Sequence, residues 1–186
     1  MDLVLFGIQG SGKGTQAKRL ATQHGYILFE AGAELRRIAA SGTELGNTVK
    51  HFIDAGHLAP HSIVMQVVKE AICMRPQSEH ILFDGIPRDL DQMRDFDRIM
   101  QECGREFRCI ELKVNEEEAM QRILQRAAEQ GRADDASEES IRRRMGLFHE
   151  KTEPVINDYR ERGMLEEVDG EGNVEAVYAR FTSALA

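Results

Sequence analysis

The stretch Gly7-Ile-Gln-Gly-Ser-Gly-Lys-Gly-Thr15 decides the fold of this chain. A short, nearly continuous apolar run, Asp2–Phe6, precedes it and is typical of a strand buried on both faces of a parallel sheet. Residues 13–24 then carry apolar side chains at helical spacing, and Gly25 is placed to end that helix. A glycine-rich turn in this setting predicts a phosphate-binding loop, because backbone N–H groups and the positive end of the helix converge there on one anion.

Each residue type in this loop has a chemical reason to be there. We expect Gly10, Gly12 and Gly14 to let the backbone curl around the anion, and Lys13 to place a positive charge between the terminal phosphates of a nucleotide. The Thr15 hydroxyl can bind the accompanying magnesium ion, although in the general motif Ser or Thr follows the lysine directly. The alternative is a glycine-rich turn without a ligand, and a lysine at this position of a strand–loop–helix unit argues against it.

The composition is that of one globular domain. The chain has 186 residues, of which 41% are apolar, and no stretch approaches the roughly 20 apolar residues of a membrane span. We expect no secretory signal, because the first apolar run leads straight into glycines. Three cysteines, Cys73, Cys103 and Cys109, lack zinc-ligand spacing and are interpreted as thiols in a reducing compartment, so we expect a cytoplasmic protein without structural zinc.

Charge is distributed unevenly along the chain. The net charge of −8 argues against a general nucleic-acid surface, since binding to the phosphate backbone needs a basic face. Within this acidic chain, six arginines gather in one short segment: Arg122, Arg126, Arg132, Arg142, Arg143 and Arg144. Such a local cationic patch favours a small polyanion over a long one.

Strand-like and helix-like segments alternate along the whole chain. After the first strand we expect strands at residues 27–29, 80–84, 107–114 and 164–168, each a short apolar run bounded by turn residues. Helical periodicity predicts helices at residues 32–40, 44–55, 61–73, 89–102, 115–129, 135–162 and 173–185. This alternation predicts an α/β fold in which a five-stranded parallel sheet has helices on both faces and forms a single domain over residues 1–186.

Two helices carry finer signals. Asn115 with Glu118 resembles a capping box at the start of the helix over residues 115–129. The last helix places four apolar side chains on one stripe, which we expect to lie in the core: Val174, Val177, Phe181 and Leu185.

Motifs beyond the phosphate loop give a more specific indication. Gly12-Lys-Gly-Thr-Gln16 closely resembles the loop of the adenylate kinase family. Asp54-Ala-Gly56 followed by Leu58 looks like the family's segment that closes over the monophosphate. Phe83-Asp-Gly-Ile-Pro-Arg88 looks like its Asp-Gly-Phe-Pro-Arg signature, with Ile86 in place of the usual aromatic residue.

The resemblance continues to the end of the arginine-rich segment. Gln92 matches the glutamine with which family members read adenine, and Arg132-Ala-Asp-Asp135 with the helix through Arg144 resembles the lid arginines. Five motifs in the right order are far more specific than one loop. Helix periodicity favours Arg144 over Arg143 as the lid-side ligand, because it places Arg144 suitably relative to Ile141 and Met145.

The resemblance implies a nucleoside monophosphate kinase that transfers the γ-phosphoryl group of ATP to AMP, reversibly and with magnesium, to give two ADP. It implies catalytic roles for Lys13, Asp84, Arg88, Arg126, Arg132 and Arg144. Contacts to ATP are implied for Gly10, Ser11, Gly12, Lys13, Gly14, Thr15, Arg122, Arg126 and Gly172. Contacts to AMP are implied for Ala31, Gly32, Arg36, His57, Leu58, Ala59, Gly85, Ile86, Pro87, Arg88, Gln92, Arg132 and Arg144. Magnesium would be held by Thr15 and Asp84, through water.

Elementary chemistry agrees with these implied roles. Transfer between two nucleotides brings several negatively charged phosphates together, so positioning and electrostatic stabilisation dominate catalysis. Arginine suits this task because its planar fork grips phosphate oxygens and stays charged. The family's architecture implies a monophosphate-binding segment over about residues 30–59, a short lid over about residues 126–135 and a monomer, with no membrane or nucleic-acid partner.

The chain departs from the family at Ala31 and Ala33, where relatives usually carry Thr and Asp of a Thr-Gly-Asp sequence. Ala31 removes a hydroxyl near the monophosphate nucleoside, and Ala33 removes a carboxylate that helps to order the water shell of the metal. Loss of one such hydrogen bond costs about 0.5–1.5 kcal/mol, which reduces activity without abolishing it. Either Glu30 or Glu34 is a candidate to replace the missing carboxylate.

Two alternatives stay open at this point. A pyrimidine monophosphate kinase would carry asparagines after the Pro-Arg pair, whereas this sequence has Asp89-Leu-Asp-Gln92. A nucleotide-binding sensor with impaired catalysis would explain the two alanines, but such a protein has no reason to keep Lys13, Asp84 and Arg88.

Overall fold

The strands form one parallel sheet. The computed structural model describes residues 1–54, 59–130 and 138–185. The strands are β1 (Asp2–Phe6), β2 (Ile27–Glu30), β3 (Ile81–Asp84), β4 (Phe107–Lys113) and β5 (Leu165–Asp169), in the spatial order β2-β3-β1-β4-β5. Every neighbouring pair runs parallel, so the predicted α/β class and five-stranded sheet are confirmed.

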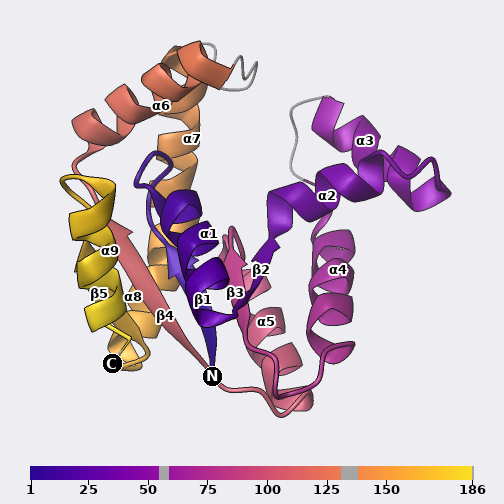
Figure 1. Ribbon diagram of the computed structural model, residues 1–186. Helices are drawn as coiled ribbons and strands as arrows, with labels where there is room; N and C mark the ends of the chain where they lie inside the picture. Colours follow the sequence, from indigo (N-terminus) through magenta and orange to yellow (C-terminus); the bar gives the residue numbers. More distant parts are fainter. Residues whose placement is uncertain (55–58, 131–137, 186) are drawn as a thin grey trace.

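Helices lie on both faces of this sheet and extend beyond its edge. They are α1 (Lys13–His24), α2 (Ala31–Ala39), α3 (Glu44–Asp54), α4 (His61–Cys73), α5 (Leu90–Glu102), α6 (Glu116–Gln130), α7 (Glu138–Leu147), α8 (Glu153–Glu161) and α9 (Val174–Ser183). Figure 1 shows α2 and α3 projecting on one side of the molecule and α6 and α7 rising on the other. Among the described residues, none of the helices has the length and apolar character needed to cross a membrane.

Strand β1 is buried on both faces, as its apolar run predicted. Leu3 packs toward α1 and α9, whereas Val4 packs toward α4, α5 and α8, because successive strand residues point to opposite faces. The order of the strands reverses beside β1, since β2 and β3 lie on one side of it and β4 and β5 on the other. Ligands of open α/β sheets bind at the carboxyl end of the strands at such a switch point, and the loop after β1 begins there.

The buried run of β1 includes one charge. Asp2 is 1% exposed, and its carboxylate accepts hydrogen bonds from Arg105 Nε at 2.7 Å and Nη2 at 2.9 Å. The backbone N–H of Ile81 donates to the same carboxylate at 2.8 Å, which ties the start of β1 to β3. A buried carboxylate is tolerated only when it is paired in this way.

The long helix expected over residues 135–162 is interrupted in its described part. Helix α7 ends at Leu147, a π-helical turn spans Phe148–Thr152, and α8 begins at Glu153. Pro154 explains the break, because proline has no N–H to donate to the carbonyl one turn before it. π-Helical turns often occur at functional sites.

The apolar stripe of the last helix lies in the core except at its first residue. Val177 and Phe181 are buried and Leu185 packs partly buried against the same cluster, as expected, but Val174 is 47% exposed. Tyr178 is also buried in this cluster. Val174 opens the helix directly after the exposed connection from β5, so its side chain reaches solvent.

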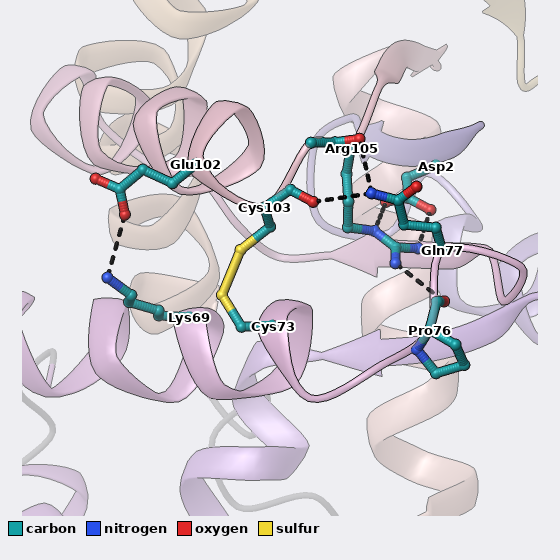
Figure 2. The surroundings of a disulfide bond; sticks show 9 residues. Asp2, Lys69, Cys73, Pro76, Gln77, Glu102, Cys103 and Arg105 are labelled. Atoms are coloured by element: carbon teal, nitrogen blue, oxygen red, sulfur yellow. Dashed lines mark hydrogen bonds and ion pairs between the residues drawn. A yellow bond between two sulfur atoms is a disulfide. The ribbon is translucent and has the colours of Figure 1, made fainter.

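The expectation of three thiols is wrong for two of the cysteines. Cys73 and Cys103 form a disulfide, with their Cα atoms 5.9 Å apart, while Cys109 is a buried free thiol. Figure 2 shows the bond joining the end of α4 to the residue after α5, beside an ion pair between Lys69 and Glu102. The two cysteines are 30 residues apart in the chain, so only the packing of α4 on α5 reveals the pairing.

Candidate functional site

The loop after β1 is built by backbone geometry. Gly10 and Gly12 have φ values of 86° and 94°, in the left-handed region that favours glycine. A Cβ at Gly10 would lie 2.3 Å from the carbonyl oxygen of Ala119, so no larger residue fits there. Gly12 is the N-cap of α1 and accepts from the N–H groups of Thr15 and Gln16 at 3.0 and 3.1 Å. These two glycines therefore have the backbone conformation that the expected curling of the loop requires.

Gly14 does not share that role. It lies within α1 and has no positive φ, so the backbone makes no demand for glycine at this position. A Cβ there would meet only Asp84 Oδ2, at an ordinary 3.9 Å. The contact is informative all the same, because it places the Asp84 carboxylate against the start of α1.

Lys13 and Thr15 occupy the first turn of α1. The Lys13 ammonium group donates to the carbonyl oxygens of Gly7 and Ile8, the latter at 3.2 Å, so it lies over the loop. The Thr15 side chain is exposed. The first N–H groups of a helix have no intrahelical acceptor and carry the positive end of its dipole, which makes this turn an anion-binding site.

Arg122 joins three parts of the chain at the loop. It donates from Nη1 to the carbonyl of Ser11 at 3.3 Å and from Nη2 to the carbonyl of Gly170 at 3.2 Å. Glu118, one helical turn away on α6, accepts a further hydrogen bond from Nη2. The expected capping box is absent for this reason: Asn115 accepts from the Glu117 N–H at 2.8 Å, while Glu118 faces Arg122.

The sequence reasoning missed Glu118 and Gly170 as neighbours of the loop. The i,i+4 spacing of Glu118 and Arg122 was a signal for the first. Nothing in the sequence marked the second. Gly172, which the resemblance assigned to ATP, lies two residues further on, between β5 and α9, with a φ of 97°.

A second group of residues surrounds Arg88, in the irregular segment after β3. The Arg88 guanidinium donates from Nε to the carbonyl of Gly85 at 2.8 Å. Its backbone N–H donates to Gln92 Oε1 at 2.8 Å, and its backbone carbonyl accepts from Thr152 Oγ1 at 2.9 Å. Ile86 and Pro87, which precede it, are buried. Side chains from α5 and from the π-helical turn thus hold the backbone of Arg88 on both sides.

Three arginines and one carboxylate converge at this point. Burial among protein atoms lowers the pKa of Arg88 below its ordinary value, although its side chain still reaches solvent. The Asp84 carboxylate opposes this effect, while the positive charges of Arg144 and Arg36 add to the lowering of the pKa. Arg36 lies on α2, with its guanidinium 3.3 Å from where a Cβ on Gly32 would lie. The geometry therefore gathers a cationic cluster suited to phosphate groups.

The remaining predicted residues fall in different places. Ala31 is buried at the start of α2, and Ala59 is half-buried before α4. Arg126 lies in α6, and its side chain is outside the described part of the structure. His57, Leu58 and Arg132 lie outside the described residues altogether.

Carboxylates line the same edge of the sheet. Glu30 and Asp84 end β2 and β3 and are paired in register, so both side chains point to the α1 face. Glu34 is instead held by Arg37 Nε at 2.8 Å. Thr15 and Asp84 offer a hydroxyl and a carboxylate at the start of α1, which are hard oxygen donors of the kind that magnesium and its bound water prefer. The donor set therefore fits magnesium.

Comparison with known proteins agrees with this geometry. A family model described as adenylate kinase matches residues 5–164. An adenylate kinase of Thermus thermophilus is 41% identical over 184 residues, which cover 98% of this chain and 96% of that protein. The adenylate kinases of Maricaulis maris and Phocaeicola vulgatus are 39% and 36% identical over 186 residues, covering all of this chain and 98% of each relative.

Proposed function

This chain belongs to the adenylate kinase family, and on that premise we propose how its residues transfer a phosphoryl group. It is a phosphotransferase that moves the γ-phosphoryl group of ATP to AMP and yields two ADP. The observation that supports the residue roles is the position of Asp84, which lies against the phosphate loop and acts electrostatically on Arg88. The loop and the arginine cluster therefore adjoin each other.

The donor nucleotide binds at the phosphate loop. The N–H groups at the start of α1 hold the phosphate oxygens of ATP, and the Lys13 ammonium moves from the loop carbonyls to the terminal phosphates. Arg122 keeps the loop in place through the carbonyl of Ser11. Gly172, on the connection after β5, lines the nucleoside side of this site.

The acceptor AMP binds at the arginine cluster. Arg36, Arg88 and Arg144 hold its phosphate, and Gln92 reads the adenine from the turn that begins α5. An oxygen of the AMP phosphate attacks the γ-phosphorus of ATP as the bond to the β-phosphate oxygen breaks. The charge spreads over the transferring oxygens, and preorganised cations stabilise it more than they stabilise the ground state.

Closure of the short lid completes the site. We assign Arg126 and Arg132 to the lid, over about residues 126–135, and the acceptor segment to about residues 30–59. Closure would exclude the water that could otherwise hydrolyse ATP. His57 and Leu58 would contact AMP from the acceptor segment, together with Ala31, Gly32 and Ala59.

Magnesium would be held, through water, by Thr15 and Asp84. When bound, it neutralises charge on the β- and γ-phosphate oxygens. Glu30 is the better candidate to replace the carboxylate absent at Ala33, because it shares a face and a register position with Asp84, whereas Glu34 pairs with Arg37. Glu30→Gln should therefore weaken magnesium binding, measured by calorimetry in the presence of ADP. Equal effects of Glu30→Gln and Glu34→Gln would contradict this choice.

We place the protein in the cytoplasm as a monomer, since adenylate kinases act there on small-molecule nucleotides. The Cys73–Cys103 bond is unusual for a reducing compartment. Fractionation of the cells that produce the protein would check its location, and measuring its mass in solution would check that it is a monomer.

A coupled assay with AMP, UMP, CMP and GMP as acceptors tests the acceptor assignment. AMP should give the highest kcat/KM, because Gln92 and the segment around it match the reading of adenine. Faster turnover of UMP would favour the pyrimidine kinase, and nucleotide binding without any transfer would favour the sensor.

A further inference from the structure

Arg88 depends on side chains for its position. It lies between β3 and α5, in a segment without regular secondary structure, so its backbone groups have no place in the sheet ladder or in a helix. Backbone N–H and C=O groups outside regular secondary structure bond to side chains or to water. Gln92 supplies the acceptor for the N–H at 2.8 Å, and the Thr152 hydroxyl supplies the donor for the carbonyl at 2.9 Å.

Like charges near Arg88 make this support important. After burial, and against the opposing effect of Asp84, the positive charges of Arg144 and Arg36 each lower the pKa of Arg88, so each of them repels the Arg88 guanidinium. Repulsion of this kind pushes flexible side chains apart. A guanidinium that binds a phosphate needs a backbone that stays in place against this repulsion. The stabilisation that a preorganised contact gives depends on its geometry.

Thr152 lies in the interruption between α7 and α8. It is the last residue of the π-helical turn Phe148–Thr152, which is continuous with α7 and therefore with Arg144. The segment that presents Arg144 to the cluster thus also holds the carbonyl of Arg88. One continuous helical segment sets the relative position of two arginines that lie far apart in the chain.

We propose that Thr152 is a positioning residue for the acceptor phosphate, acting through Arg88. Its hydroxyl fixes the Arg88 backbone against the helix that carries Arg144, so that both guanidinium groups meet the AMP phosphate in one arrangement. This proposal rests on the proposed role of Arg88 in binding AMP. Threonine suits the position because it donates a hydrogen bond while its β-branched side chain has few rotamers to lose.

The test compares Thr152→Val with Thr152→Ser and with a matched control. Valine keeps the shape and removes the hydroxyl, whereas serine keeps the hydroxyl. Thr22→Val removes a hydroxyl that donates to the carbonyl of Lys18, also at 2.9 Å, on the exposed side of α1. We expect Thr152→Val to lower kcat/KM for AMP by about five- to tenfold and to raise the AMP dissociation constant similarly, since one hydrogen bond is lost. KM for ATP should stay within about twofold, as should every constant of Thr22→Val.

Rescue and non-additivity distinguish positioning from a structural role. Thr152→Ser should recover most of the loss, and Thr152→Val should add little to Arg88→Ala, because both act through the same guanidinium. Equal losses toward ATP and AMP, no rescue by serine, or additive effects in the double variant would each overturn the proposal. If Arg88→Ala itself leaves AMP binding unchanged, the assignment of Arg88 fails; if only Thr152→Val is silent, the positioning role alone fails.

Discussion

The phosphate loop and the arginine cluster hold phosphates by different means. The loop is one run of consecutive residues, shaped by Gly10 and Gly12 and set between a fully buried strand and a helix. The cluster brings together Arg36 from α2, Arg88 from the irregular segment after β3, and Arg144 from α7. The loop is fixed by its own backbone, while the cluster depends on the packing of distant segments and on side-chain hydrogen bonds. AMP binding at the cluster should therefore respond to substitutions at more distant residues than ATP binding at the loop does.

The largest effect should come from the loop itself. Lys13→Met should reduce kcat by about 10²–10³-fold, because a preorganised cation aimed at the developing charge is lost. Lys18→Met, on the exposed side of the same helix, is the control and should retain activity. Steady-state kinetics would measure both, and similar turnover by the two variants would show that the loop does not work through its lysine.

The disulfide joins the ends of α4 and α5 that lie away from Arg88, so its loss should act on the stability of the fold and not directly on the cluster. Cys73→Ser should lower the free energy of unfolding by about 3–4 kcal/mol, since the bond closes a loop of 30 residues between α4 and α5. Chemical denaturation with and without reductant would measure this. Thiol titration of the denatured, unreduced protein should find Cys109 alone, because it is the free cysteine. Three reactive thiols would mean that the bond does not form in solution.

Removing the central arginine of the cluster should affect the kinetics of AMP much more than those of ATP. Arg88→Ala should lower kcat/KM for AMP by about 10²-fold, as expected when a charged partner of a phosphate is truncated, with KM for ATP little changed. Arg94→Ala, on the exposed face of α5, is the matched control. A change in ATP affinity alone would mean that the donor and acceptor sites are wrongly divided.

Two glycines test the claim that backbone geometry shapes the loop. Gly10→Ala should destabilise the fold by about 1–3 kcal/mol, because it combines a positive φ with a Cβ 2.3 Å from a carbonyl oxygen. Gly14→Ala should leave stability unchanged or raise it by up to about 1 kcal/mol, since the residue is helical. Thermal unfolding of both variants would decide, and equal losses would contradict the distinction.

The smallest effect should appear at His149, in the π-helical turn. Its Nδ1 hydrogen-bonds to Glu153 at 2.8 Å, and Nε2 lies 2.8 Å from Glu116 in an ion-pair contact without hydrogen-bond geometry. The hydrogen bond with Glu153 and the nearby carboxylates raise the pKa of His149, despite some opposing desolvation. The resulting stability is present below the ordinary pKa of about 6.5 and is lost as the pH rises through the raised value.

The melting temperature should show this loss. Wild type should lose stability relative to His149→Gln between about pH 6 and pH 8, by less than about 1 kcal/mol because the pair is exposed and screened. High salt should shrink the difference further. A difference between the two proteins that is independent of pH would show that His149 acts by packing.

More of the phosphate loop than of the arginine cluster was predictable from the sequence. The alternation of apolar runs placed β1, the loop and α1 correctly, because each depends on residues close in the chain. It did not reveal that Gly14 is free of backbone strain, or that Glu118 turns from capping to bind Arg122. The first outcome depends on where α1 begins, and the second on Arg122 lying between the carbonyls of Ser11 and Gly170.

The sequence by itself determined the phosphate loop, the α/β class and, through its ordered motifs, the family. Local periodicity and glycine placement are sufficient for this, since they act over one strand or one helical turn. Only the tertiary structure decided that Cys73 pairs with Cys103 and that Thr152 holds Arg88. These contacts join residues tens of positions apart, and no local pattern specifies them, because the packing of whole helices on the sheet sets their distances.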